Sequence, residues 1–284
     1  MPSTIEWTEE TWNPTTGCTQ VSPGCAYCYA KTLAEGFLKK QYPQGFGLVR
    51  MHPERLSKPS KIKKPTMFFV NSMSDLFHEA IPERFVLDVF KVMNREKRHI
   101  FQVLTKRPER MKDFVLAHYP EGLSGHIWMG VSVENQRFTY RIDVLKEVPA
   151  EIRFLSCEPL LGPLYIAAQL EGIHWVIGGG ESGSHLKKRQ GRLCRPEWVH
   201  SLRDQCRRMG TPFFFKQWGH ILANPDPNDP TAKQNGGQTK GGTLLQGQPI
   251  REWPSVWSDP ISHLRDEVED VSPQNLSTAI LQLT

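Results

Sequence analysis

The 284-residue sequence has no long hydrophobic run, which argues against a membrane-spanning helix. No segment approaches the roughly 18 apolar residues that a membrane span requires. Residues 1–10 include neither a basic region nor an apolar stretch, so we expect no signal peptide and a cytoplasmic location. Thiols stay reduced in the cytoplasm. The six cysteines are therefore expected to be metal ligands or buried thiols rather than disulfides.

The sequence also lacks an excess of acidic residues. It has 35 Lys and Arg against 30 Asp and Glu, a formal net charge of +5. Basic residues gather at 58–64, 106–107 and 187–189. Such clusters fit a surface that binds nucleic acid, and they equally fit ordinary solvated side chains. Charge alone leaves both interpretations open.

A second pair of closely spaced metal ligands is missing as well. Structural zinc sites use four ligands, typically as two pairs. Cys157, Cys194 and Cys206 each stand alone, and the ten histidines show no ligand spacing. Cys157 ends an expected strand, so it stays a candidate fourth ligand or reactant. With it, a zinc site remains an alternative.

Three cysteines are concentrated in eleven residues, Cys18 to Cys28. Cys25 and Cys28 are separated by two residues, and Cys18 reaches the same centre across a loop that Pro23 and Gly24 can bend. Thiolates select zinc, copper(I) or iron–sulfur clusters. Three local ligands without a neighbouring fourth indicate an open coordination position. A 4Fe–4S cluster with one iron free for a substrate or cofactor fits this pattern better than zinc.

Short apolar runs alternate with helical segments along the middle of the chain. The runs are 67–71, 100–105, 127–131, 152–156, 173–177 and 212–216. Helices are expected at 29–40, 82–98, from Pro108, at 136–146, 165–170 and 196–209. This alternation predicts a parallel sheet covered by helices, with strands buried on both faces. An α/β barrel, closed or partial, and an open doubly wound sheet both satisfy it.

Polar residues at the end of each run favour the barrel. Barrels build their active sites from the carboxyl ends of several strands, whereas polar loop starts explain only one or two such ends. The residues are Asn71, Ser72, Ser74, Asp75, Thr105, Lys106, Arg107, Ser132, Glu134, Ser156, Glu158, Glu181, Lys216 and Gln217.

Beyond residue 219 the composition changes. Residues 220–257 are rich in turn-forming residues, with 243–245 and 249–253 as a candidate hairpin. Residues 258–284 form an acidic tail that we expect to be disordered. The expected organisation is a barrel over 1–219, followed by this extension and the tail.

A three-cysteine loop that ends in Cys-x-aromatic-Cys, ahead of an α/β barrel, resembles the radical S-adenosylmethionine superfamily. More narrowly, four phrases resemble an uncharacterised phage and bacterial family of radical-SAM-like proteins, over about residues 4–255. The phrases lie at 5–18, 178–183, 202–206 and 213–219.

The resemblance implies a partial (β/α)6 barrel and an enzyme that holds a 4Fe–4S cluster through Cys18, Cys25 and Cys28. It also implies S-adenosylmethionine on the free iron, and an electron donor such as a flavodoxin or ferredoxin. The product would be a 5′-deoxyadenosyl radical that abstracts hydrogen from the substrate. The chain departs from the superfamily in its first cysteine gap, which has six residues instead of three. Its glycine–glutamate phrase also follows a later strand.

The resemblance further implies which strand ends bind the cofactor and the substrate. Ser72, Ser74 or Asp75 would take the amino group of S-adenosylmethionine. The other implied cofactor residues are Ser132, Glu134, Gly178, Gly179, Gly180 and Glu181. The implied substrate residues are Lys106, Arg107, Glu158, Lys216 and Gln217. The basic clusters and the phage association favour a nucleic acid or nucleotide substrate. The alternative is a non-catalytic nucleic-acid-binding protein stabilised by zinc or an iron–sulfur cluster.

Overall fold

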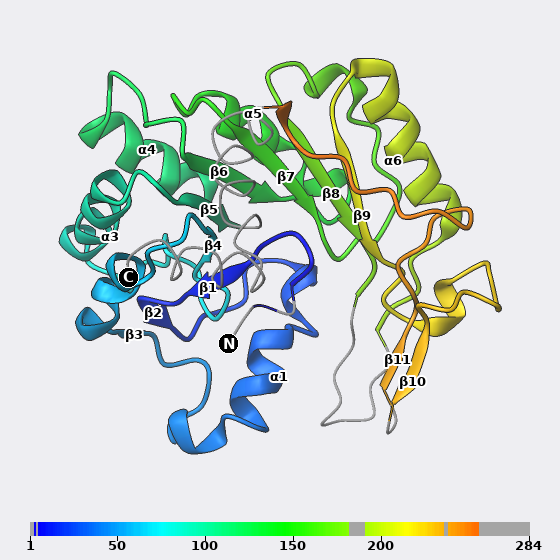
Figure 1. The fold of residues 1–284 in the computed structure, drawn as a ribbon, viewed down its shortest axis with the longest axis horizontal. Coiled ribbons are helices and arrows are strands. Elements are labelled where there is room, and N and C mark those ends of the chain that lie inside the picture. Colours follow the sequence, from blue (N-terminus) through cyan, green and yellow to red (C-terminus); the bar gives the residue numbers. More distant parts are fainter. Residues whose placement is uncertain (1–2, 4, 182–190, 236–237, 256–284) are drawn as a thin grey trace, which may run out of the picture. The chain divides into compact units, whose positions relative to one another are not determined.

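A seven-stranded parallel sheet forms the centre of the computed structural model, which describes residues 3, 5–181, 191–235 and 238–255 (Figure 1). In sheet order the strands are β1 (Glu10–Trp12), β4 (Met67–Val70), β5 (Ile100–Thr105), β6 (Ile127–Ser132), β7 (Arg153–Cys157), β8 (Trp175–Gly179) and β9 (Phe213–Gln217). Every neighbouring pair runs parallel. Each of the six predicted apolar runs is a strand, which confirms the α/β class.

The edge strand β1 adds a seventh strand to the six that the sequence predicts. It is three residues long and pairs with β4, with Glu10 opposite Phe68 and Trp12 opposite Val70. No apolar run marks it, because only Trp12 of its residues is buried. The cysteine loop follows β1 within a few residues. This loop therefore starts at the carboxyl edge of the sheet, like the loops after the other strands.

Helices follow the strands and cover one face of the sheet (Figure 1). They are α3 (Glu83–Arg95), α4 (Pro108–His118), α5 (Tyr140–Lys146) and α6 (Pro196–Met209). Their apolar residues share one core with alternate strand residues such as Phe68, Phe101 and Met129. Gly210 ends α6 in the left-handed conformation (φ 67°), as its position predicts. The expected helix at 165–170 is instead the short 3-10 turn η5 (Ala167–Gln169).

The opposite face of the sheet is buried by aromatic rings. Trp128 contacts Trp175 with ring centroids 6.1 Å apart. The Trp7 ring lies 4.6 Å from Phe69 of β4 and 6.5 Å from Phe154 of β7. In a flat sheet those strands would be about 14 Å apart, at about 4.8 Å per strand. One indole contacts both rings because the sheet curls around it. The sheet is thus an open, curled one with β1 and β9 at its edges.

The segment between β1 and β4 carries the cysteines and several short elements. The antiparallel pair β2 (Thr15–Thr16) and β3 (Arg50–Met51) brackets α1 (Tyr29–Glu35). The helix α1 ends earlier than expected, at Gly36, and Phe37 is 91% exposed instead of packing on an apolar face. The other short elements of this segment are η1 (Pro23–Cys25), η2 (Lys39–Gln41), η3 (Pro53–Ser57) and α2 (Lys58–Lys61), and two more, η4 (Gln136–Phe138) and η7 (Ile221–Ala223), lie further along the chain.

The chain divides into two units, Met1–Glu252 and Trp253–Thr284. In the first unit, β10 (Lys233–Asn235) and β11 (Gln238–Lys240) form an antiparallel pair. The candidate hairpin segments 243–245 and 249–253 do not pair as a hairpin. Leu245 bridges Gln248, and Arg251 bridges Phe214 of β9. The expected tail at 258–284 lies outside the described residues. Within the described ranges, no helix has the length and apolar character needed to span a membrane.

Candidate functional site

A cavity of about 190 Å³ opens at the carboxyl ends of the strands. Each of the six predicted strands contributes a residue from its end to the lining: Asn71, Thr105, Ser132, Ser156, Gly180 and Lys216. Cys18, Cys25 and Cys28 line the same cavity. The structure therefore brings the cysteine loop and the polar strand ends together, as the sequence predicts.

Backbone contacts fix the cysteine loop at its start. The Gly17 N–H donates to the Met73 carbonyl at 3.1 Å, and the Cys18 N–H donates to the Phe46 carbonyl at 3.0 Å. Gly17 has a φ of 86°, and a Cβ there would lie 2.1 Å from the Leu48 carbonyl oxygen. Only glycine combines this conformation with so close an approach. The loop thus enters the site along a fixed backbone path.

The cysteine side chains are half-buried free thiols. The pKa of Cys18 is raised to about 11, first by burial and then by the charge of Asp75, while Arg107 opposes the change. Burial also raises the pKa of Cys28, against backbone N–H groups at the start of α1 that lower it. The Cys18 and Cys28 thiols are therefore protonated at neutral pH, and a bound metal would have to displace these protons.

Three free cysteines in one loop are a donor set of the kind that holds an iron–sulfur cluster. Within residues 3, 5–181, 191–235 and 238–255, no group of three or more His, Cys, Asp or Glu side chains is arranged to hold one ion. Cys157, the candidate fourth ligand, is fully buried in the core against the helices and does not line the cavity.

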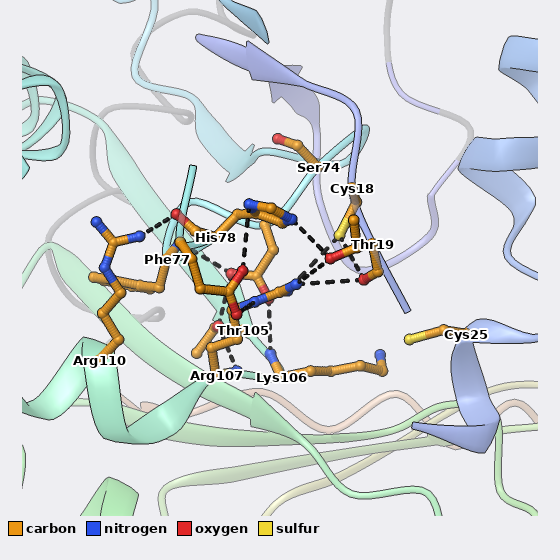
Figure 2. A network of polar contacts seen from close by, with 12 residues as sticks. Cys18, Thr19, Cys25, Ser74, Phe77, His78, Thr105, Lys106, Arg107 and Arg110 are labelled. Carbon is orange, nitrogen blue, oxygen red and sulfur yellow. Dashed lines mark hydrogen bonds and ion pairs between the residues drawn. The ribbon is translucent and has the colours of Figure 1, made fainter. Parts of the chain in front are cut away.

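A buried polar network joins the cysteine loop to the ends of β4 and β5 (Figure 2). The Arg107 guanidinium, 7% exposed, donates to Asp75 Oδ2 at 3.2 Å and to Cys18 Sγ at 3.8 Å. The Thr105 hydroxyl donates to Asp75 Oδ1 at 2.7 Å. Figure 2 also shows Lys106 extending toward Cys25. A guanidinium and an ammonium group thus stand beside the cysteines.

Glu134 does not line the cavity, and its side chain contacts the cysteine loop instead. Its carboxylate is fully buried, accepts a hydrogen bond from the Ser22 hydroxyl, and pairs with Arg141 at 3.1 Å. A Cβ on Gly24 would lie 2.5 Å from Glu134 Oε1. The glycine therefore lets the loop approach the carboxylate. Lys106 Nζ lies 3.9 Å from the same oxygen.

The far wall of the cavity carries a second set of charges. Lys216 Nζ donates to Glu158 Oε2 at 2.6 Å, and Glu158 Oε1 is buried with no hydrogen-bond partner among the described residues. Glu181 accepts from Arg192 Nε at 2.9 Å, and the Arg192 Nη2 donates to the Pro23 carbonyl at 2.9 Å. Arg192 also lies over the Tyr27 ring, 5.1 Å from its centroid. Arg192 thus links Glu181 to the cysteine loop.

Most sequence-predicted site residues line the cavity. They are Ser72, Ser74, Asp75, Ser132, Gly180, Glu181, Lys106, Arg107, Glu158 and Lys216, besides the cysteines. Those that do not line it are Glu134, Cys157, Gly178, Gly179 and Gln217. Ser72 and Ser74 face the site with occupied hydroxyls, because these bond to Asn13 and Thr15.

Sequence reasoning assigns no role to Trp7 and names Asn71 only as one of the polar strand ends, although both line the cavity. Asn71 ends β4 with a φ of 63°, and its Oδ1 accepts from the Thr15 N–H at 3.2 Å. Its Nδ2 is buried and finds no partner in the part of the chain that the structure describes. Asparagine tolerates the left-handed region, so its place after an apolar run was the available signal. No pattern in the sequence marks Trp7.

A family model described as "Protein of unknown function (DUF5131)" matches residues 2–254. Among curated proteins, none matches the sequence. Two similar solved structures are a mutant spore photoproduct lyase and another mutant of it with bound AdoMet and dinucleoside spore photoproduct. The first is 13% identical with a TM-score of 0.46, covering 95% of this chain and 76% of that chain. The second is 14% identical with a TM-score of 0.44, covering 94% and 75%. At these identities and TM-scores, the similarity is too low to assign a function to this chain.

Proposed function

The chain belongs to the DUF5131 family of proteins of unknown function, and from its own site we propose that it is a radical S-adenosylmethionine-type enzyme with a 4Fe–4S cluster. One observation supports this most strongly. Three free cysteines of one loop line the same cavity as the carboxyl ends of six parallel strands. Three thiolates would leave one coordination position of the cluster open, and the polar strand ends would lie around it.

Cys18, Cys25 and Cys28 would hold the cluster. When bound, the cluster and S-adenosylmethionine would supply a 5′-deoxyadenosyl radical able to take a hydrogen atom from a substrate. The chain's own task is to bind, orient and exclude water. Aromatic side chains are suited to the last of these. Those in the cavity lining are Trp7, Tyr27, Tyr29, Phe46 and Phe69.

Hydrogen-bonding groups left over inside the cavity would orient the cofactor. Asn71 Nδ2 is a buried donor without a partner in the described ranges, so a ligand acceptor would satisfy it. The Tyr29 hydroxyl donates to the Ser72 carbonyl at 2.6 Å and stays neutral, because burial raises its pKa. This bond fixes the backbone next to Asn71. We assign the cofactor's polar end to Asn71 in place of the hydroxyls of Ser72 and Ser74.

The substrate proposed for the site is a nucleotide or nucleic acid. Lys106 and Lys216 offer positive charge to phosphate, and Glu158 Oε1 is an acceptor awaiting a donor. Aromatic walls suit the stacking of a base. The basic cluster at 58–64 lies elsewhere: Lys58, for example, pairs with Glu10 at 2.9 Å. The cluster at 187–189 lies outside the described residues.

Anaerobic reconstitution with iron and sulfide tests the proposal. We expect about four irons per chain, visible absorption of a cluster, and 5′-deoxyadenosine when S-adenosylmethionine and a reductant are added. The variant in which Cys18, Cys25 and Cys28 are all alanine should lose all three signals. Cys206→Ala, a buried cysteine outside the cavity, is the matched control and should keep them. A protein that binds one zinc and never cleaves S-adenosylmethionine would contradict the proposal.

A further inference from the structure

Arg107 makes more contacts with the cysteine loop than a substrate-binding residue needs. Its side chain is 7% exposed. Its Nη1 donates to Cys18 Sγ at 3.8 Å, and its Nη2 donates to the Thr19 carbonyl at 3.3 Å and to the Thr19 hydroxyl at 3.1 Å (Figure 2). A guanidinium has five N–H donors in a fixed plane. Arg107 uses this plane to hold two consecutive residues of the loop.

The other side of the guanidinium is fixed to the sheet. Its Nη1 also donates to Asp75 Oδ2 at 3.2 Å, and its Nε donates to Glu79 Oε1 at 3.0 Å. Glu79 is mostly exposed, whereas Asp75 is 6% exposed. A pair with an exposed carboxylate is screened and weak, so Asp75 is the partner that decides the position.

Asp75 is itself immobilised by both neighbouring strand ends. Its Oδ1 accepts from the Thr105 hydroxyl at 2.7 Å and from the Phe77 N–H at 3.0 Å. Its Oδ2 accepts from the Lys106 N–H at 3.1 Å. A carboxylate with this many donors has one available orientation. The guanidinium is therefore oriented before any ligand enters the cavity.

We propose that Arg107 is a positioning residue for Cys18: it ties the Cys18–Thr19 segment to the ends of β4 and β5 and donates an N–H to the Cys18 sulfur. This inference rests on the proposed function, in which Cys18 is a cluster ligand. Hydrogen bonds to ligand sulfurs and nearby positive charge raise the reduction potential of an iron–sulfur cluster. Arg107 thus adjusts the cluster's potential as well as the loop's position, and it does not serve as a substrate-binding group.

Two variants separate the charge from the contacts. Arg107→Gln removes both, and we expect the cluster's reduction equilibrium to shift about tenfold toward the oxidised form, equivalent to about 59 mV for one electron. Arg107→Lys keeps the positive charge but cannot bridge Asp75, Cys18 and Thr19 at once. The reduction potential of the cluster should therefore fall less in Arg107→Lys than in Arg107→Gln. A redox titration followed by EPR measures both.

Hydrogen exchange of the protein without its cluster tests the positioning role. Both Arg107 variants should raise the exchange rate of residues 17–20 about tenfold, because both lose the bridge. Arg110→Gln is the matched control: Arg110 donates to the His78 and Ile81 carbonyls and has no contact with Cys18 among the described interactions. It should change neither the potential nor the exchange of residues 17–20.

The two measurements distinguish failure of this inference from failure of the proposed function. A wild-type protein that takes up no iron contradicts the proposed function, and exchange still decides whether Arg107 holds the loop. An intact cluster with unchanged potential in Arg107→Gln overturns the donation to sulfur. Unchanged exchange of residues 17–20 in both variants overturns the positioning role.

Discussion

At the scale of single residues, Gly24 and Glu134 show how tightly the cysteine loop is packed. Gly24 lies between Pro23 and Cys25, and its missing side chain is the space that the Glu134 carboxylate occupies. Glu134 cannot retreat, because Arg141 holds it from the other side at 3.1 Å. A methyl group at position 24 must therefore move the loop and not the carboxylate.

We expect Gly24→Ala to cost about 1–3 kcal/mol of stability through overpacking and to lower the iron bound after reconstitution. Gly47→Ala is the matched control, since a Cβ there meets no atom within 4 Å. Urea unfolding and iron analysis of both variants check this. Equal iron content in the two variants would show that the loop tolerates the methyl group.

The buried pair of Glu134 and Arg141 gives a second prediction at this scale. Both side chains are essentially inaccessible, at 0% and 1% exposure. Arg141→Met leaves the Glu134 charge buried with only Lys106, 3.9 Å away, as an ionic partner, which should lower the free energy of unfolding by about 3–5 kcal/mol. The double variant Glu134→Gln with Arg141→Met should regain much of the loss, because no charge is then buried. Urea denaturation measures all of these.

Arg137→Met is the control for this pair, because Arg137 is exposed on the turn just before α5. Its stability should change by less than about 0.5 kcal/mol. A double variant no more stable than Arg141→Met alone would mean that the arginine acts mainly by packing on the Phe138 ring, 4.4 Å from the guanidinium carbon.

At the scale of elements, histidines occupy equivalent places where strands begin. His99 precedes β5, and its Nδ1 accepts from the Thr66 N–H at 3.2 Å. His174 precedes β8, and its Nδ1 accepts from the Arg153 N–H at 3.1 Å. Burial lowers the pKa of both, and also that of His126 before β6. In each accepting ring, the nitrogen that would take a proton faces a backbone donor.

These histidines should make the fold sensitive to mild acid. Their pKa values lie below 6.5 in the folded chain and near 6.5 in the unfolded chain. The unfolded chain then binds more protons, so their stabilisation is complete above pH 6.5 and is lost as the pH falls through the folded pKa values. Urea unfolding between pH 7 and pH 4.5 should show this slope. His99→Gln should flatten it, and an unchanged slope would assign the acid sensitivity to other groups.

The sequence predicts elements that have their own strong pattern. The runs at β4 to β9 are predicted because both faces of the sheet are buried, which leaves continuous apolar segments. The sequence does not predict the strand β1, because two of its three residues are only partly buried. The sequence also does not predict the early end of α1 or the position of the β10–β11 pair. Turns and contacts with other segments determine both.

In the site, the cysteines and the strand ends are predictable because each strand positions its own end. The sequence does not predict which other residues these side chains contact. Whether Ser72 faces a ligand or bonds to Asn13, and whether Glu134 lines the cavity or holds Ser22, depends on contacts between distant segments. Ser22 and Glu134 are separated by 112 residues. Spacing within one segment carries no information about such pairs.

At the scale of the whole molecule, the main core and the cysteine loop are separate. The core between sheet and helices includes none of Cys18, Cys25 and Cys28. Cys18 and Cys28 pack instead on a small cluster around Ala30 and Phe46. The sheet and its helices therefore pack on each other without any of these three cysteines.

We therefore expect the variant with alanine at positions 18, 25 and 28 to fold. Its free energy of unfolding should fall by roughly 1–3 kcal/mol, within the range of ordinary point changes, and its circular dichroism spectrum should match that of the cluster-free wild type. Thermal and urea unfolding check this. A variant that does not fold would favour the alternative of a metal-stabilised binding protein over an enzyme.

The distance along the chain between Cys18 and Arg107 has a consequence for biosynthesis. The two are 89 residues apart. At about 5–20 residues per second, a ribosome adds the arginine about 4–18 seconds after the cysteine. Throughout that interval the nascent chain lacks Arg107, so the surroundings of the three thiols are incomplete. The proposed cluster could reach the finished site only after translation of β9, because Lys216 of that strand lines the same cavity.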